Sequence, residues 1–360
     1  LVLILWVLYG YSFAFGGRGA LWGGLDKLFL SGVTRDSVTG TVPEVVFMVY
    51  QMAFAIITPA IIVGAFAERM KFSAMLWFMG IWFTVVYAPI AHWVWGDGGW
   101  LREMGVLDFS GGTVVHINAG IAGLVAALVL GPRRGYPAAP MPPNNLVYTV
   151  IGASILWVGW FGFNGASQLA AGTAADINSV SQIFANTNLA AAGGVMAAMF
   201  TTAILYKGKV DATMVFNGAI GGLVSITAEP LAPSMLASVL IGGVGGVLVV
   251  IFVPLLDKLK IDDVVGAIPA HLVCGIWGTM IVPFSYTNAI MPNEAGDPNY
   301  IGQLVGVVLT GVFVMIASSI VWYILKLTIG VRPTAEEEEM GLDKAEIGLE
   351  AYPEFAVGRA

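Results

Sequence analysis

The chain has 360 residues, of which 58% are hydrophobic and only 11% are charged. A soluble domain usually carries about 25% charged residues, so this composition excludes an ordinary soluble globular protein. The formal net charge of −7 comes without a basic patch interleaved with aromatic residues, which excludes a nucleic-acid-binding surface. Cys274 is the single cysteine, so the sequence excludes a disulfide framework.

Apolar runs of membrane-spanning length recur along the whole chain. Each run is continuously apolar rather than alternating, which predicts helices and not the strands of a membrane barrel. Ten runs can be recognised, at about 1–16, 44–66, 73–95, 111–131, 145–168, 184–206, 211–229, 233–256, 264–284 and 301–327. The sequence therefore predicts an all-α polytopic membrane protein. We expect a further segment before the first run, because the chain begins at Leu1 inside a run shorter than a full span.

The positive residues predict the orientation of these helices. Twelve of the sixteen fall in alternate loops or after the last run, namely Arg69, Lys71, Arg133, Arg134, Lys207, Lys209, Lys258, Lys260, Lys326, Arg332, Lys344 and Arg359. By the positive-inside rule these loops and the C-terminus are cytoplasmic. The first run then travels outward, and we expect an external N-terminus before the preceding segment.

The loops between runs are short, so we predict one transmembrane domain over residues 1–327 and a cytoplasmic tail over residues 328–360. The tail contains four consecutive glutamates, Glu336–Glu339, and a like-charge run is usually solvated. Two alternatives remain open for this tail: a disordered solubilising segment, or a regulatory or inter-subunit element.

An internal repeat relates two of the ten runs. Asp108 precedes His116 by eight residues, and Asp263 precedes His271 by the same number, within a shared pattern D-x7-H-x3-G-x2-G. Glycines four and seven residues after a histidine share its helix face, which favours close helix contact. The two runs have opposite predicted directions, as in inverted-repeat transporters with sites near the midplane. The sequence therefore predicts an inverted-repeat helical bundle.

Ionisable residues within a membrane are functional candidates because burying charge there is expensive. His116 and His271 are predicted to line a pore, since a facing pair of neutral imidazoles can donate and accept along a polar track. His92, near the external end of its run, is interpreted as structural. Asp108 has two compatible roles, as a helix cap or as a negative charge that stabilises an external cation. A competing hypothesis makes the two predicted pore histidines axial ligands of a membrane haem.

Aromatic residues gather where three runs approach the external side. Trp157, Trp160, Phe161 and Phe163, with Asn164 and Ser167, lie toward the external end of one run, where Trp95 and Phe54 of two other runs should also lie. Aromatic faces with one hydroxyl acceptor suit a small cation. The competing interpretation is ordinary packing or an interfacial aromatic belt.

At these residues the chain resembles the ammonium transporter (Amt/MEP/Rh) family, in its bacterial Amt type. The matching segments are Leu5-Trp6-Val7-Leu8-Tyr9-Gly10-Tyr11-Ser12, Gly64-Ala65-Phe66-Ala67-Glu68-Arg69, Asp108-Phe109-Ser110-Gly111-Gly112-Thr113-Val114-Val115-His116-Ile117-Asn118, Trp160-Phe161-Gly162-Phe163-Asn164, Asn186-Thr187 and Gly341-Leu342-Asp343. They cover essentially the whole chain in order. The resemblance implies eleven spans with the N-terminus outside, so the ten runs correspond to part of the second through the eleventh, and the first is missing.

The resemblance also implies a role for each matching position. Trp95, Phe54 and Ser167 match an external ammonium recruitment site, which Asp108 supports. Phe54 and Phe163 match two stacked phenyl rings that close the pore beneath that site. Trp160 matches a pore-wall tryptophan, and His116 and His271 match the twin pore histidines.

The resulting hypothesis is an ammonium channel or transporter in the cytoplasmic membrane, active in nitrogen uptake, with ammonium or methylammonium as substrate. It takes up ammonium outside, deprotonates it and conducts ammonia, with or without a separately moved proton. The resemblance implies a homotrimer and, as in many members, a PII signalling protein at the cytoplasmic face. No nucleophile–base or metal-ligand arrangement stands out in the sequence, so we expect no enzymatic activity and no cofactor. The alternative is an ammonium sensor with little flux. The chain departs from the family at Gly266, Ile268-Pro269-Ala270 and Ile347-Gly348, which leaves the second histidine's helix start and PII coupling open.

Overall fold

The computed structural model describes residues 1–139, 141–286 and 298–353, and helices dominate it. The elements, where η marks a short 3₁₀ or π segment, are α1 (Val2–Leu5), η1 (Trp6–Gly10), α2 (Tyr11–Phe15), η2 (Leu28–Leu30), β1 (Val38–Thr39), β2 (Val42–Pro43), α3 (Glu44–Phe66), α4 (Phe72–Trp82), η3 (Phe83–Tyr87), α5 (Ala88–Trp95), α6 (Trp100–Glu103), η4 (Gly112–Ile117), α7 (Asn118–Leu130), α8 (Leu146–Gly165), η5 (Ala166–Gln168), α9 (Ala174–Leu205), α10 (Ala212–Thr227), α11 (Met235–Lys258), η6 (Ile268–Val273), α12 (Cys274–Ser285), α13 (Tyr300–Thr328), α14 (Ala335–Met340) and η7 (Asp343–Ile347).

Within the described residues, eight helical stretches are long and apolar enough to cross a membrane. Two shorter apolar stretches, Val2–Phe15 and Ala212–Thr227, coincide with the other two predicted runs. The predicted all-helical membrane fold is confirmed, and the number of spans stays a prediction. One predicted boundary is wrong, because α9 begins at Ala174 and not near 184. Its first turns are polar and therefore invisible to hydropathy, while Thr173 and Asp176 form a capping box there.

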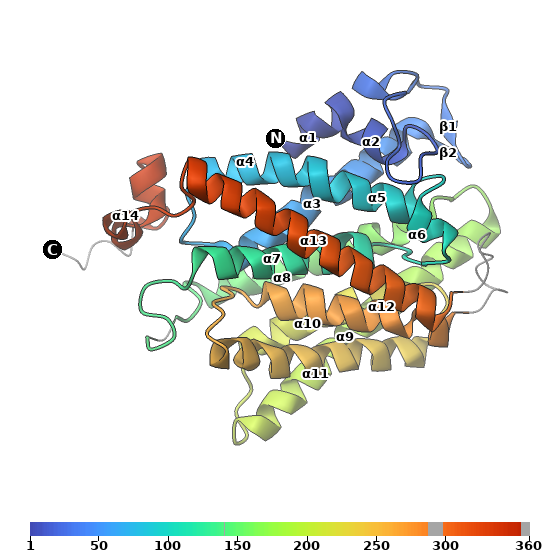
Figure 1. Ribbon diagram of the computed structural model, residues 1–360. Helices are drawn as coiled ribbons and strands as arrows, with labels where there is room; N and C mark the ends of the chain where they lie inside the picture. The colour runs from blue at the N-terminus through green and yellow to red at the C-terminus, as the bar shows by residue number, and fades with distance from the viewer. Residues whose placement is uncertain (140, 287–297, 354–360) are drawn as a thin grey trace.

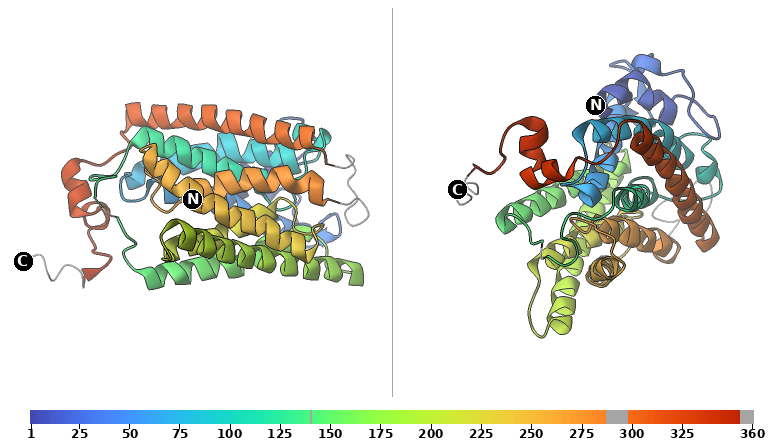
Figure 2. Two further views of the ribbon diagram at one scale, coloured as in Figure 1. Left: turned by 90° about the horizontal axis from the view of Figure 1, so that it is seen from below. Right: turned by 60° about the vertical axis from the view of Figure 1, so that its left-hand side comes forward.

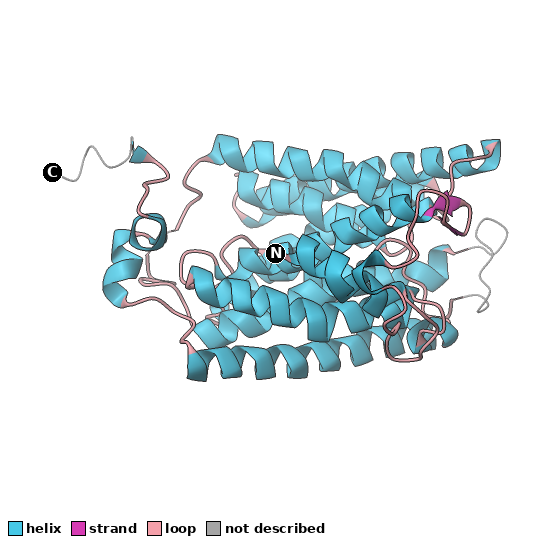
Figure 3. Cartoon of the chain, turned by 90° about the horizontal axis from the view of Figure 1, so that it is seen from above, coloured by secondary structure: helices cyan, strands magenta, loops and turns pink. Residues whose placement is uncertain are grey.

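The long helices run side by side as one bundle, and α13 crosses its face obliquely (Figure 1). The antiparallel hairpin of β1 and β2 lies at one end of the bundle, and α14 lies at the opposite end (Figures 1 and 3). We call these the outer end and the inner end, after the predicted orientation. The view turned toward α14 shows this tail helix beside the ends of the bundle helices rather than among them (Figure 2).

Glycines allow α9, α10 and α11 to pack with their backbones almost in contact. A Cβ atom at Gly194 of α9 would lie 2.1 Å from the carbonyl oxygen of Gly218 in α10. A Cβ atom at Gly242 of α11 would lie 2.0 Å from the carbonyl oxygen of Ala190 in α9. Any larger residue would therefore separate these helices, as expected where small residues drive packing in a membrane.

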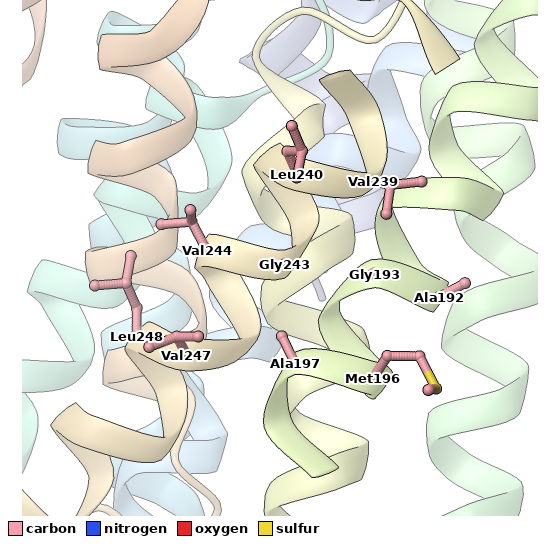
Figure 4. Close-up of a pocket in the computed structure, with 10 residues that line it drawn as sticks. All are labelled: Ala192, Gly193, Met196, Ala197, Val239, Leu240, Gly243, Val244, Val247 and Leu248. Carbon is pink, nitrogen blue, oxygen red and sulfur yellow. The ribbon is translucent and has the colours of Figure 1, made fainter. Parts of the chain in front are cut away.

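An apolar groove runs along the outer surface of this helix trio, between α9 and α11 (Figure 4). Its lining is Ala192, Gly193, Met196, Ala197, Val239, Leu240, Gly243, Val244, Val247 and Leu248. No polar side chain lines it among the described residues, so the groove suits acyl chains or an apolar helix and not an ionic substrate.

The two histidine segments cross near the middle of the bundle. Segment η4 leads into α7, and η6 leads into α12. A Cβ atom at Gly120, four residues after His116, would lie 2.6 Å from the backbone nitrogen of Leu272. A Cβ atom at Gly275, four residues after His271, would lie 3.2 Å from the Cβ atom of His116. The contact is reciprocal, as the repeat predicts: each histidine segment packs on the glycine face of the other.

A buried ion cluster ties the inner-end loops together. The Nη2 atom of Arg133 lies 2.8 Å from Asp262 Oδ1, and the Nη2 atom of Arg69 donates to the Asp262 carbonyl oxygen at 2.6 Å. The side chains of Arg69 and Asp262 are fully buried. Burial opposes ionisation of Asp262, but the hydrogen bonds from Arg133 and the charge of Arg69 outweigh it and hold its pKa below the ordinary value. The cluster therefore favours a charged carboxylate at neutral pH.

The described part of the predicted tail packs on the same end. Arg332 pairs with Glu338, and Arg134, which follows α7, pairs with Glu339 at 2.6 Å. Helix α14 is capped by Thr334. Two members of the glutamate run are thus paired with arginines. Helix α13 ends at Thr328, the first residue of the predicted tail. The rest of that tail, residues 354–360, lies outside the described residues, and the boundary at 327 stays a prediction.

Candidate functional site

The two predicted pore histidines face each other at the crossing of η4 and η6. Their Nδ1 atoms lie 3.0 Å apart, and their rings are 5.1 Å apart at 25°. At this distance one Nδ1 carries a hydrogen and the other accepts it, which neutral imidazoles allow. His116 is buried, and its Nε2 atom has no hydrogen-bond partner among the described residues. The contact leaves no room for an iron ion between the nitrogens, which argues against the haem hypothesis.

A row of aromatic rings leads from the histidines toward the outer end. The Phe163 ring centroid lies 5.7 Å from that of His116 and 4.3 Å from that of Phe54. The Phe54 ring in turn lies 5.4 Å from Trp95, edge to face. Trp160 stacks on His116 at 5.3 Å and 18°. These rings come from α3, α5, α8 and η4, so the fold brings the predicted pore residues into one continuous file.

The file ends in a cavity of about 230 Å³ at the outer end. Its lining is Phe47, Tyr50, Gln51, Phe54, Val94, Trp95, Arg102, Phe109, Ser167 and Leu169. We call this cavity the outer pocket. The three predicted recruitment residues, Trp95, Phe54 and Ser167, all line it. Aromatic faces with a hydroxyl group make it suitable for a small cation.

Asp108 lies behind the outer pocket and does not line it. Its carboxylate accepts four backbone N–H groups, from Gly111 at 2.9 Å, Gly112 at 2.6 Å, Thr113 at 2.8 Å and Val114 at 2.9 Å. These are the otherwise unpaired donors at the start of η4. Gly111 has a φ of 111°, which favours glycine and lets the chain fold back over the carboxylate. The capping contacts predicted for Asp108 are therefore present.

The Asp108 backbone also positions an aromatic residue of the pocket. Its carbonyl oxygen accepts the indole N–H of Trp95 at 2.7 Å. Asp108 can thus act on a cation in two ways, through its nearby negative charge and through the orientation of the Trp95 ring. Because both carboxylate oxygens already accept two N–H groups each, direct coordination of the cation is not its role in this arrangement.

The repeated aspartate has a weaker version of the same contacts. Asp263 accepts the backbone N–H groups of Ala267 at 3.1 Å and Ile268 at 2.7 Å. Gly266, where the chain departs from the family pattern, has a φ of 75°, so glycine suits that turn. The departure therefore leaves the helix start before His271 intact and capped.

His92 lies away from the file. Its Nδ1 atom is 2.7 Å from the Ala14 carbonyl oxygen, and its Nε2 atom contacts the Gly19 carbonyl oxygen. The ring is fully buried and joins α5 to α2 and to the loop after it. These contacts agree with the structural interpretation of this residue.

Seven residues of the pocket lining were missed by reasoning from the sequence, and three of them carry polar groups: Tyr50, Gln51 and Arg102. The Tyr50 hydroxyl donates to the Phe163 carbonyl oxygen at 2.8 Å and contacts the Ser167 hydroxyl. Tyr50 precedes Phe54 by four residues on α3, so helical spacing could have found it. Gln51 and Arg102 gave no such signal, because neither belongs to a recognised pattern.

The chain is similar to known proteins over its length. A model described as the Ammonium Transporter Family matches residues 1–352. An ammonium transporter of Bacillus subtilis is 41% identical over 362 aligned residues, which cover 98% of this chain and 87% of that protein. The ammonium transporter Amt1 of Archaeoglobus fulgidus is 37% identical, with 98% and 88% covered.

Solved structures give the same answer. The fold matches Candida albicans Mep2 with a TM-score of 0.85 and 31% identity, covering 93% of this chain and 77% of that one. It matches a protein described as a sensor Amt protein with a TM-score of 0.87 and 30% identity, covering 96% and 86%. The predicted resemblance is confirmed by family, sequence and fold together. This multi-pass membrane protein belongs to the ammonium transporter family.

Proposed function

We propose that the protein carries ammonium across the membrane through a pore within its own chain. The observation that supports this most directly is the continuous file from Trp95 through Phe54 and Phe163 to the pair of His116 and His271. Membership of the ammonium transporter family supports the substrate. The roles below are those that physical chemistry assigns to each part of the file.

The outer pocket recruits the cation. Trp95 and Phe54 supply aromatic faces, and each cation–π contact contributes about 0.5–2 kcal/mol. Ser167 supplies a hydroxyl oxygen as acceptor. The Asp108 carboxylate adds negative potential from behind the pocket. Together these groups do not form a set of metal ligands, so the pocket favours a small, weakly held cation over a tightly coordinated ion.

The phenyl rings below the pocket favour deprotonation. The centroids of Phe54 and Phe163 are 4.3 Å apart, a packing distance that leaves no room for a hydrated ion. A bare cation in this apolar constriction loses its hydration at large cost, whereas neutral ammonia loses little. Ammonium therefore transfers its proton to water on the outer side and passes the rings as ammonia when thermal motion separates them.

Beyond the rings, the histidine pair receives the neutral molecule. The paired Nδ1 atoms require that one imidazole carries a hydrogen at Nδ1 and the other does not, and both rings present their edges to a small hydrogen-bonding solute. Trp160, stacked on His116, forms the adjoining wall. A separately moved proton would make transport electrogenic, and recording charge movement alongside uptake of labelled substrate distinguishes that route from neutral flux.

The test replaces both histidines. We expect the variant His116→Ala/His271→Ala to lose saturable methylammonium uptake or to admit potassium, when expressed in oocytes and compared at equal surface abundance. Cys274→Ala is the matched control, because Cys274 lies one turn after His271 and faces the Gly245 carbonyl oxygen. Unchanged rate and selectivity in the double variant would make the pore assignment wrong.

A second candidate is an ammonium sensor with little flux. One structural neighbour is described as a sensor Amt protein, and this observation favours keeping the alternative. The two hypotheses differ in turnover. Saturable uptake that far exceeds one substrate per chain supports the transporter, whereas stoichiometric binding without uptake supports the sensor.

The assembly and its surroundings stay predictions. We propose a homotrimer in the cytoplasmic membrane, with the inner end and C-terminus cytoplasmic and the outer end external. A PII signalling protein is proposed as a partner of the inner end. Native mass spectrometry of the detergent-purified protein, and reaction of single engineered cysteines with an impermeant reagent in intact cells, test these statements.

A further inference from the structure

One charged side chain lines the outer pocket among the described residues, and it is positive. Arg102, in the short helix α6, belongs to the pocket lining together with Trp95, Phe54 and Ser167. A guanidinium is cationic under all ordinary conditions. A pocket that recruits a cation would not be expected to include it, so its position calls for a physical account.

Two contacts hold the guanidinium at the rim of the outer pocket. Its Nη1 atom donates to Asp97 Oδ1 at 3.0 Å and to the Trp95 carbonyl oxygen at 3.3 Å. The side chain of Arg102 is 42% exposed, whereas that of Asp97 is 63% exposed. Asp97 does not line the pocket, as far as the described residues show. The ion pair is therefore a dipole whose positive end borders the pocket and whose negative end lies toward solvent.

We propose that Arg102 determines the affinity of the outer pocket for its cation. Its charge opposes accumulation of ammonium at the pocket, and Asp97 partly compensates for that charge. This inference rests on the proposed function, because it takes ammonium to be the cation that enters there. The site then holds substrate weakly enough to release it toward the phenyl rings, instead of trapping it outside.

The structure predicts opposite effects for the two partners. Replacing Arg102 with glutamine removes the positive end and leaves Asp97 alone, so the KM for methylammonium falls. Replacing Asp97 with asparagine leaves Arg102 uncompensated, so the KM rises. We expect a change on the order of two- to fivefold for Arg102→Gln, because Coulomb's law gives only a modest energy for a unit charge near a protein surface. The change in Asp97→Asn is smaller, because Asp97 does not line the pocket among the described residues. The double variant lies between the two.

The experiment measures initial rates of labelled methylammonium uptake in oocytes at two ionic strengths. The Debye length falls from about 30 Å at about 0.01 M to about 8 Å at about 0.15 M. We expect the KM differences at low salt to shrink at high salt. We also expect the maximal rate of Arg102→Gln to fall at low salt, because a tighter pocket releases substrate more slowly toward the phenyl rings. Arg102→Lys keeps the positive charge, so its KM should lie close to that of the unmodified protein and above that of Arg102→Gln. Arg35→Gln is the control. Arg35 is exposed in the loop before β1, so its replacement removes the same charge from a position outside the pocket lining.

Two results would overturn the inference while leaving the proposed function in place. The first is an unchanged KM in both Arg102→Gln and Asp97→Asn. The second is a change of the same sign in both variants that persists at high salt, which would mean that Arg102 only positions Trp95. Absence of saturable uptake by the unmodified chain would instead refute the proposed function, and this inference with it.

Discussion

Replacing Asp108 with asparagine tests how the start of the first histidine segment is held. Asp108 is 6% exposed, and each of its carboxylate oxygens accepts two backbone N–H groups. Asparagine has the same shape but keeps one acceptor oxygen, while its NH2 group is a donor. Two of the four backbone donors at η4 would therefore face another donor and lose their partner.

The magnitude follows from this count. A buried donor left without a partner costs about 1–3 kcal/mol, so two such donors predict a loss of about 2–6 kcal/mol in the free energy of unfolding. Asp263 provides an internal comparison, because each of its oxygens accepts one N–H group. Asp263→Asn orphans one donor, which predicts a loss of about 1–3 kcal/mol by the same rule.

Equilibrium unfolding in mixed micelles, with increasing SDS fraction, measures both variants against the unmodified protein. Uptake assays on the same variants report the outer pocket, because Asp108 also holds the Trp95 indole through its carbonyl oxygen. That contact uses the backbone and survives the substitution. We therefore expect a change in the KM for substrate to come mainly from loss of negative charge, in the direction of weaker recruitment.

The reasoning would be refuted by either of two results. One is a loss of stability in Asp108→Asn below about 1 kcal/mol, less than a single orphaned donor costs. The other is an effect no larger than that of Asp263→Asn, since the two carboxylates differ in the number of donors they accept.

Two further predictions concern the ion cluster at the inner end and the helix packing beside the histidine pair. Asp262→Asn removes the carboxylate charge beside the buried guanidinium of Arg69, which costs about 3–5 kcal/mol at neutral pH. The pKa of Asp262 is lowered in the folded state, so its contribution to the free energy of unfolding is present above the ordinary value of about 3.9 and is lost as the pH falls through the folded pKa. Unfolding measured at a series of pH values should therefore show the free energies of the variant and the unmodified protein converging at low pH. A difference that stays constant with pH would contradict this. Gly120→Ala places a Cβ atom 2.6 Å from the η6 backbone, and such overpacking costs about 1–3 kcal/mol. Gly152→Ala in α8 is the control, because its Cβ atom meets nothing within 4 Å, and its free energy of unfolding should rise by up to about 1 kcal/mol. A thermal midpoint lowered equally in both glycine variants would exclude steric conflict as the cause.

The histidine crossing shows how far a local pattern can predict a site. The repeated spacing of histidine and glycine put both on one helix face, and the structure packs Gly120 against the segment of His271 and Gly275 against that of His116. A glycine face predicts close contact because only hydrogen occupies it. It does not predict the partner, so the 3.0 Å contact between the two Nδ1 atoms came only from the structure.

The outer pocket shows the opposite case. Trp95, Phe54 and Ser167 were predicted by resemblance, but Tyr50 and Arg102 also line the pocket and were not. Tyr50 shares a helix face with Phe54, so periodicity carried a usable signal. Arg102 lies in a four-residue helix after a turn, where no periodic pattern exists. Its position depends on how that turn folds back over Trp95.

The sequence alone determined that this is a helical membrane protein, because hydropathy is a local property that accumulates along each run. The repeat and the family motifs likewise survive in linear order, so they predicted which residues to consider. Tertiary structure alone decided that the Nδ1 atoms of His116 and His271 meet, that the aromatic rings form one file, and that an arginine borders the outer pocket. Those features depend on contacts between helices far apart in the chain, and in a membrane such contacts follow from shape and hydrogen bonding rather than from hydropathy.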